Sequence, residues 1–129
     1  MFDFKSPTTQ MLGRWQPWHD GHTALFVNAL SVTGQVIIMC RDVQFQDAGP
    51  GQDDNPYDYF EVKKNIVAGL SSVGYKLHYD YEVAKVPNIV DISYGRGVGY
   101  TFTEHDLGKD IHNISATKIR AKLRKEGKL

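Results

Sequence analysis

The ten residues GRWQPWHDGH, Gly13 to His22, lie between the first apolar segment of the chain and the first segment with helical periodicity. Residues 8–15, TTQMLGRW, predict a first strand, and residues 21–33 carry apolar side chains at the spacing of one helix face. Two tryptophans, two histidines, a proline and two glycines therefore fall where a first strand turns into a first helix. In parallel α/β folds, ligands bind beyond the carboxyl ends of the strands, where this turn lies.

The two histidines of this stretch suit a phosphate site. His19 and His22 are three residues apart, so on a first helical turn they face the same side. Gly21 between them allows close approach of the backbone. A helix N-terminus adds unpaired N–H groups and the positive end of the helix dipole. We therefore expect a phosphate to bind at the start of this helix.

A zinc site is the alternative interpretation of the same pair. Zinc needs a third or fourth ligand. Cys40, His78 and His105 are isolated in the sequence, and no CxxC pair or further cluster is present. The sequence therefore predicts no protein metal site.

The rest of the chain alternates between strand and helix patterns. QVIIMC (residues 35–40) is typical of a buried parallel strand. Helical spacing resumes over residues 59–70, strands are predicted within residues 76–86 and 88–95, and residues 115–129 form a basic amphipathic helix. This order predicts a single α/β domain over residues 1–129: a Rossmann-like, doubly wound parallel sheet of about five strands with helices on both faces.

Composition narrows the functional class. Fifteen Lys and Arg balance fifteen Asp and Glu, which argues against nucleic acid or an anionic membrane as the main partner. Cys40 is the only cysteine, so no disulfide within the chain is expected. No apolar run reaches the ~18 residues of a membrane span, and the first residues lack the features of a signal peptide. These patterns predict a cytoplasmic protein.

Residues 13–22 resemble the HxGH motif of the nucleotidyltransferase superfamily, in the GRFQPFHxGH form of nicotinamide-mononucleotide-type adenylyltransferases. ISATKIR, Ile114 to Arg120, resembles the ISxTxxR motif of the same superfamily. NPYDYFEV, residues 55–62, is similar to the NPFTxxER segment of the nicotinamide-mononucleotide branch, with Val62 in place of the arginine. The HxGH-type and ISxTxxR-type motifs occur in the expected order, one after the first strand and one opening the last helix.

The resemblance implies transfer of a nucleoside monophosphate from a nucleoside triphosphate to a phosphorylated small molecule, with release of pyrophosphate. It implies that His19, His22 and Arg120 are the catalytic residues. It also implies nucleotide contacts at nine further positions: Gly13, Arg14, Trp15, Gln16, Gly21, Arg96, Ile114, Ser115 and Thr117. Mg²⁺ is expected with the triphosphate.

The acceptor site is expected near Arg41, Asn55 and Tyr57. Arg41 ends the second predicted strand on the ligand side of the sheet. Aromatic rings near both motifs are candidates for stacking on a base or an acceptor ring, although core packing is favoured for Trp15. The polar loop over residues 41–54 is expected to close over the site.

Three alternatives remain open on the sequence. AMP transfer from ATP is favoured, and CMP transfer from CTP is the second possibility. A nucleotide-binding module without turnover and an interaction domain docked to another enzyme belong to other classes. A homodimer is compatible with so small a sheet protein, but the sequence offers no obvious interface stripe.

Overall fold

Three parallel strands and three helices make up the part of the chain that this computed structural model describes, residues 1–42, 49, 52–97, 99–108, 111 and 114–129. In chain order the elements are β1 (Thr9–Gly13), α1 (Asp20–Thr33), β2 (Val36–Arg41), α2 (Tyr59–Ser71), β3 (Tyr81–Val86) and α4 (Ala116–Lys125). The alternation of strand and helix predicted from the sequence is confirmed for these six elements.

The sheet has the order β1-β2-β3, with both strand pairs parallel. Met11 of β1 lies beside Ile38 of β2, which in turn lies beside Val83 of β3. All three strands therefore end at one edge of the sheet. The turn into α1 and the approach to α2 leave from that same edge, as the sequence predicted.

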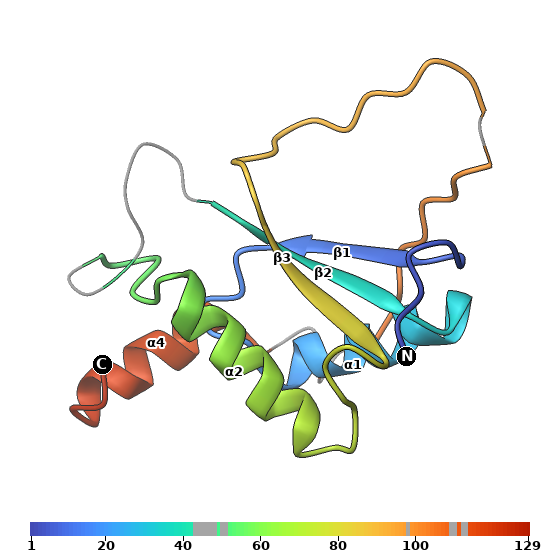
Figure 1. Cartoon of the computed structure of the whole chain (residues 1–129). Coiled ribbons are helices and arrows are strands. Elements are labelled where there is room, and N and C mark those ends of the chain that lie inside the picture. The colour runs from blue at the N-terminus through green and yellow to red at the C-terminus, as the bar shows by residue number, and fades with distance from the viewer. Residues whose placement is uncertain (43–48, 50–51, 98, 109–110, 112–113) are drawn as a thin grey trace.

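The prediction of about five strands with helices on both faces is wrong for the described residues. The sheet has three strands, and Figure 1 shows α1, α2 and α4 on the same side of it. Residues 88–95, predicted as a strand, form neither strand nor helix, and residues 87–97 and 99–108 arch away from the sheet (Figure 1). Val90 in this segment is 81% exposed. Apolar residues alternate with polar ones here as in a strand, but no strand among the described residues pairs with them, so no strand forms.

Two predicted boundaries also moved, for local backbone reasons. The first strand ends at Gly13 rather than near residue 15, because Trp15 takes a left-handed φ of 56°. The third strand begins only at Tyr81, because His78 has a φ of 71° and interrupts the extended run before it. The first helix ends at Thr33, where its predicted spacing ends, and Gly34 follows with a φ of 88°, which favours glycine.

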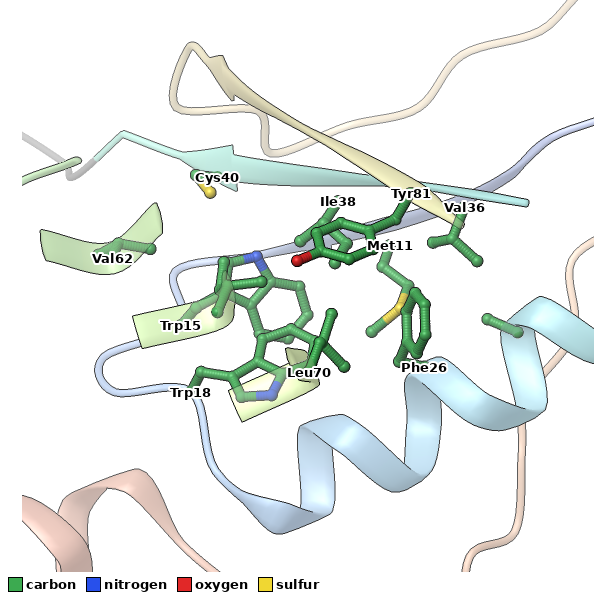
Figure 2. Packing of buried hydrophobic residues seen from close by; sticks show 12 residues of the cluster. Met11, Trp15, Trp18, Phe26, Val36, Ile38, Cys40, Val62, Leu70 and Tyr81 are labelled. Carbon is green, nitrogen blue, oxygen red and sulfur yellow. The ribbon is translucent and has the colours of Figure 1, made fainter. Parts of the chain in front are cut away.

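The core lies between the sheet and the helices. In β2 the side chains of Val36, Ile38 and Cys40 are buried and alternate with half-buried ones, as expected for a strand covered on one face. Figure 2 shows them facing Phe26 of α1 and the two indoles. Trp18 lies over α2, where a Cβ on Gly69 would come within 3.0 Å of its ring.

Trp15 completes this core from the loop after β1. Its side chain is 6% exposed and its indole Nε1 donates a hydrogen bond to the Met39 carbonyl at 3.2 Å. A Cβ at Gly13 would lie 2.8 Å from the Trp15 ring. Glycine at this position therefore lets the indole fold back against β1, and the favoured core-packing interpretation of Trp15 is confirmed.

Among the described residues, the helices are too short or too polar to cross a membrane.

Tyr81 gives a test of this core. Its ring is fully buried, its hydroxyl has no hydrogen-bond partner among the described residues, and burial raises its pKa to about 12. An unpaired buried donor is unfavourable, so Tyr81→Phe is expected to raise the free energy of unfolding by about 1 kcal/mol in urea denaturation. Tyr79→Phe, at an exposed ring, is the control. A larger loss of stability in Tyr81→Phe than in the control contradicts the unpaired hydroxyl.

Candidate active site

His19 and His22 form a stacked pair at the N-terminus of α1. Their ring centroids lie 3.6 Å apart with an interplanar angle of 20°. His19 is the N-cap residue, and His22 occupies the third position of the helix. The His22 ring also meets the Trp15 indole edge-to-face, with centroids 4.8 Å apart. The buried aromatic core therefore supports the pair from below.

Backbone hydrogen bonds fix the protonation pattern of both rings. The Gly21 N–H donates to His19 Nδ1 at 3.0 Å, and the His19 N–H donates to His22 Nδ1 at 3.1 Å. A nitrogen that accepts a hydrogen bond carries no proton in the neutral ring. Each neutral imidazole is therefore assigned the tautomer with its proton on Nε2, which makes Nε2 a hydrogen-bond donor toward a ligand.

Both imidazoles are neutral near pH 7. Burial, with a smaller contribution from the neighbouring His19, lowers the pKa of His22 to about 3. Burial also lowers the pKa of His19, and Asp20 opposes that shift. The pair therefore offers two neutral N–H donors beside the positive end of a helix, a combination that suits phosphate oxygens.

Gly21 is required by this geometry. A Cβ there would lie 2.8 Å from Cε1 and 3.0 Å from Nδ1 of His19, and 3.5 Å from the Ile111 carbonyl. Glycine thus lets the His19 ring fold over the helix N-terminus. The same contact places Ile111 against the start of α1.

The two motif segments, residues 13–22 and residues 114–120, meet in the structure. Arg120 of α4 is 5% exposed, and its Nη1 donates to the Gln16 carbonyl at 2.6 Å across 104 residues of sequence. Its Nη2 donates to Thr117 Oγ1 at 3.3 Å and lies 3.5 Å from the Asp54 carboxylate. Arg120 therefore ties α4 to the loop after β1.

Ser115 and Thr117 lie at the start of α4. Ser115 is the N-cap residue, and its hydroxyl accepts a hydrogen bond from the Lys118 N–H at 3.4 Å. Thr117 is exposed and Ile114 is half-buried. A second helix N-terminus therefore lies beside the motif loop, with hydroxyls of the type predicted from the sequence.

Gln16 has a structural task that the sequence did not reveal. Its side-chain Nε2 donates to the Tyr57 carbonyl at 2.8 Å, and the Tyr57 N–H donates to its Oε1 at 3.0 Å. This amide pair joins the loop after β1 to the approach to α2. Nearby, Arg14 Nη1 lies 3.4 Å from Asn55 Oδ1.

Two of the three predicted acceptor residues line a cavity, and the third does not. Arg41 and Tyr57 line a cavity of about 280 Å³ at the carboxyl edge of the sheet, together with Arg14 and Gln16. Asn55 is buried behind it, 7% exposed. The cavity also includes Lys85 and Asp58, which sequence reasoning did not single out. The signal for Lys85 was its place near the end of a strand whose neighbour ends in Arg41.

Other predicted residues lie elsewhere. Arg96 is exposed in segment 87–108 and does not line the cavity. The ring of Trp15 is buried, so it offers no surface for stacking on a ligand, and Trp18 is buried likewise. Most of the predicted closing loop, residues 43–48 and 50–51, lies outside the described residues.

The described residues offer no further zinc ligand beside the histidine pair. Within the described ranges, no three His, Cys, Asp or Glu side chains gather in a way that would hold a metal ion. Nδ1 of each histidine already accepts a backbone N–H. Cys40 is buried in the core, where burial raises the pKa of its thiol to about 12, so the sulfur stays protonated.

Gly21→Ala is expected to displace the His19 ring and to lower the free energy of unfolding by about 1–3 kcal/mol, because the new methyl overlaps the imidazole. Denaturant unfolding measures the loss, and ¹⁵N NMR of the histidine ring follows the tautomer. Gly95→Ala is the matched control, since its Cβ would meet nothing within 4 Å. Equal stability of the two variants contradicts the tight fit at Gly21.

The His22 pKa predicts a pH dependence of stability. The folded pKa of about 3 lies below the ordinary value of 6.5, so between these pH values the unfolded chain binds a proton that the folded protein does not. This contribution to stability is present above pH 6.5 and falls as the pH drops toward 3. His22→Asn is expected to flatten this decline in urea unfolding relative to His78→Asn. Parallel profiles for the two variants contradict the shift.

Comparison with known proteins gives a structural likeness. No family model matches the chain, and no curated protein matches it. It resembles two solved structures of a bifunctional NMN adenylyltransferase/ADP ribose pyrophosphatase from Francisella tularensis, one of them complexed with AMP and a Mn ion. Each shows a TM-score of 0.52 and 27% sequence identity, and the match covers 64% of this chain and 22% of that chain. The chain spans about a fifth of those proteins and is similar to them in its nucleotidyltransferase-type α/β fold.

Proposed function

We propose that this protein is an adenylyltransferase, which transfers AMP from MgATP to a small phosphate-bearing acceptor and releases pyrophosphate. The single observation that carries the proposal is the stacked His19–His22 pair at the start of α1, with two Nε2 donors and both Nδ1 atoms engaged. The likeness to an NMN adenylyltransferase/ADP ribose pyrophosphatase, solved in one case with AMP, supports ATP as the donor.

In the proposed reaction an oxygen of the acceptor phosphate attacks the α-phosphorus of ATP in line. The bond between that phosphorus and the oxygen bridging to the β-phosphate breaks, and pyrophosphate leaves. The protein holds the two reactants and stabilises the charge on the phosphoryl oxygens. His22 and His19 donate from Nε2 to these oxygens, because neutral imidazoles with this tautomer present N–H groups outward.

The leaving pyrophosphate is assigned to the start of α4. Ser115 and Thr117 supply hydroxyls there, and the helix N-terminus supplies N–H groups. Arg120 has five N–H donors. One is used on the Gln16 carbonyl and another on Thr117, so the guanidinium positions the loop and also keeps donors for the pyrophosphate.

Mg²⁺ enters this proposal as part of the nucleotide substrate. The histidine pair offers N–H groups and the start of α4 offers the Ser115 and Thr117 hydroxyls, which suit phosphate oxygens. Mg²⁺ in sites of this type is held largely by the phosphates and by water.

The test is release of pyrophosphate by the purified chain with Mg²⁺ and each of ATP, CTP, GTP and UTP, across a panel of acceptors that includes nicotinamide mononucleotide, glycerol 3-phosphate and phosphocholine. We expect turnover with ATP. His22→Asn is expected to lower kcat about 10²–10³-fold, the usual effect of losing one donor to the transition state. His78→Asn, at a histidine paired with Glu82 on the surface, is the matched control.

Other outcomes of this assay support the alternative functions or contradict the role of the histidines. Turnover with CTP alone supports a cytidylyltransferase and contradicts the choice of ATP. Binding of ATP without pyrophosphate from any acceptor supports a nucleotide-binding module without turnover. Equal rates for His22→Asn and His78→Asn contradict the role of the histidine pair.

A further inference from the structure

A carboxylate already lies on the guanidinium that the proposed function assigns to pyrophosphate. Nη2 of Arg120 is 3.5 Å from Oδ1 of Asp54 and donates to Thr117 Oγ1 at 3.3 Å. Nη1 of the same side chain donates to the Gln16 carbonyl at 2.6 Å. Asp54 therefore lies on the nitrogen that does not hold the loop after β1, and it shares that nitrogen with a hydroxyl at the start of α4.

Residues 52–55, here called the strap, belong to no helix or strand and reach α4 at two points. Besides the Asp54 contact, Arg124 Nη2 donates to the Asp53 carbonyl. The end of the strap that leads toward α2 is held in place, because Asn55 is only 7% exposed. Asp54 can therefore leave the guanidinium by a rearrangement within the strap, without the loss of a helix or strand.

Positive charge is concentrated around this contact. Burial lowers the pKa of Arg120, Asp54 opposes that shift, and the nearby Arg14 and Arg124 add to it. Three guanidinium groups thus act on the place that the Asp54 carboxylate occupies. One carboxylate carries a single negative charge, whereas pyrophosphate and the triphosphate of a nucleotide carry several. A polyphosphate therefore balances this group of cations better than Asp54 does.

The contact is also unequal in its cost to the two partners. The Asp54 side chain is 73% exposed, whereas that of Arg120 is 6% exposed. Their separation of 3.5 Å exceeds about 2.9 Å, the upper end of strong charge-assisted bonds. An exposed carboxylate loses little when it returns to water, because surface ion pairs contribute little to stability. The buried guanidinium needs an anion, and the present one is weakly held.

We propose that Asp54 makes an autoinhibitory contact: its carboxylate occupies the place on Arg120 that polyphosphate oxygens take, and a polyphosphate must displace it to bind. Asp54 thereby raises the Kd for the polyphosphate and competes with pyrophosphate for the guanidinium. That the polyphosphate belongs to ATP rests on the proposed function, whereas the competition rests on the contact itself. The outcome differs from the loop closure predicted from the sequence, because residue 54 leaves the site as the ligand enters.

The test is isothermal titration calorimetry of the full chain with inorganic pyrophosphate, without nucleotide or acceptor. Asp54→Asn is expected to lower the Kd for pyrophosphate about two- to fivefold, the range that corresponds to the loss of an exposed ion pair. Asp53→Asn is the matched control. It removes the same charge from the adjacent residue, whose contact with α4 is made by the backbone carbonyl. The control is expected to keep the wild-type Kd.

Equal Kd values for the wild type and Asp54→Asn overturn the inference. An equal decrease of the Kd in Asp53→Asn also overturns it, because the effect is then one of net charge and not of the contact with Arg120. Absence of pyrophosphate binding in both the wild type and Asp54→Asn overturns it as well.

A second measurement follows the carboxylate directly. In ¹³C NMR of the wild-type chain, saturating pyrophosphate is expected to shift the side-chain carboxyl signal of Asp54 and to leave that of Asp53 nearly unchanged. An unchanged Asp54 signal overturns the inference, because the ligand then binds beside the carboxylate and not in its place.

Neither measurement needs turnover, so the two proposals fail separately. Displacement of Asp54 by pyrophosphate, without pyrophosphate release from any triphosphate, leaves this inference standing and rejects the proposed function. Turnover with ATP, together with equal pyrophosphate Kd values for the wild type and Asp54→Asn, keeps the proposed function and rejects this inference.

Discussion

The hydrogen bond from Arg120 Nη1 to the Gln16 carbonyl is the contact on which the candidate site depends. It is buried, 2.6 Å long, and joins residues 104 positions apart. Gln16 extends the connection, because its side-chain amide pairs with the backbone of Tyr57 before α2. One short loop after β1 thereby holds three elements: α1 through the histidine pair, α4 through Arg120 and α2 through Tyr57. Removing either partner of the buried bond leaves a charged or polar group without its hydrogen bond.

The same loop after β1 also holds the histidine pair in place, through the Trp15 indole. The Trp15 indole packs against the His22 ring and donates to the Met39 carbonyl of β2. A Cβ at Gly13 would lie 2.8 Å from the Trp15 ring, and one at Gly21 would lie 2.8 Å from the His19 ring. The bulky residues of GRWQPWHDGH thus pack beneath the histidine pair, and its glycines leave the space that the rings occupy. The imidazoles are in this way presented as neutral donors with little freedom to turn.

The sequence predicted the elements around the site well because its signals there are local. Helical spacing, an N-cap position and glycine after α1 depend on neighbouring residues, and α1, β2 and α2 match their predictions closely. The predicted fourth strand does not form because pairing is not local: Val90 and Ile92 alternate with polar residues, but no strand in the described part of the chain pairs with them. The contacts that side chains make with distant segments could also not be predicted from the sequence. The Gln16–Tyr57 amide pair leaves no pattern in the sequence, since it joins segments more than forty residues apart.

The long separation between the two motif segments has a consequence for how ligand and fold are coupled. A chain that has formed only β1 and α1 holds the histidines but not the start of α4, and the loop-closure entropy of about a hundred residues must be met before the two halves face each other. A ligand that contacts both helix N-termini therefore binds the complete domain and not its parts. Its binding free energy is added to the cooperative unfolding of the entire chain, as mass action requires. The concentration of such a ligand, and not only the sequence, then sets the fraction of the chain that is folded.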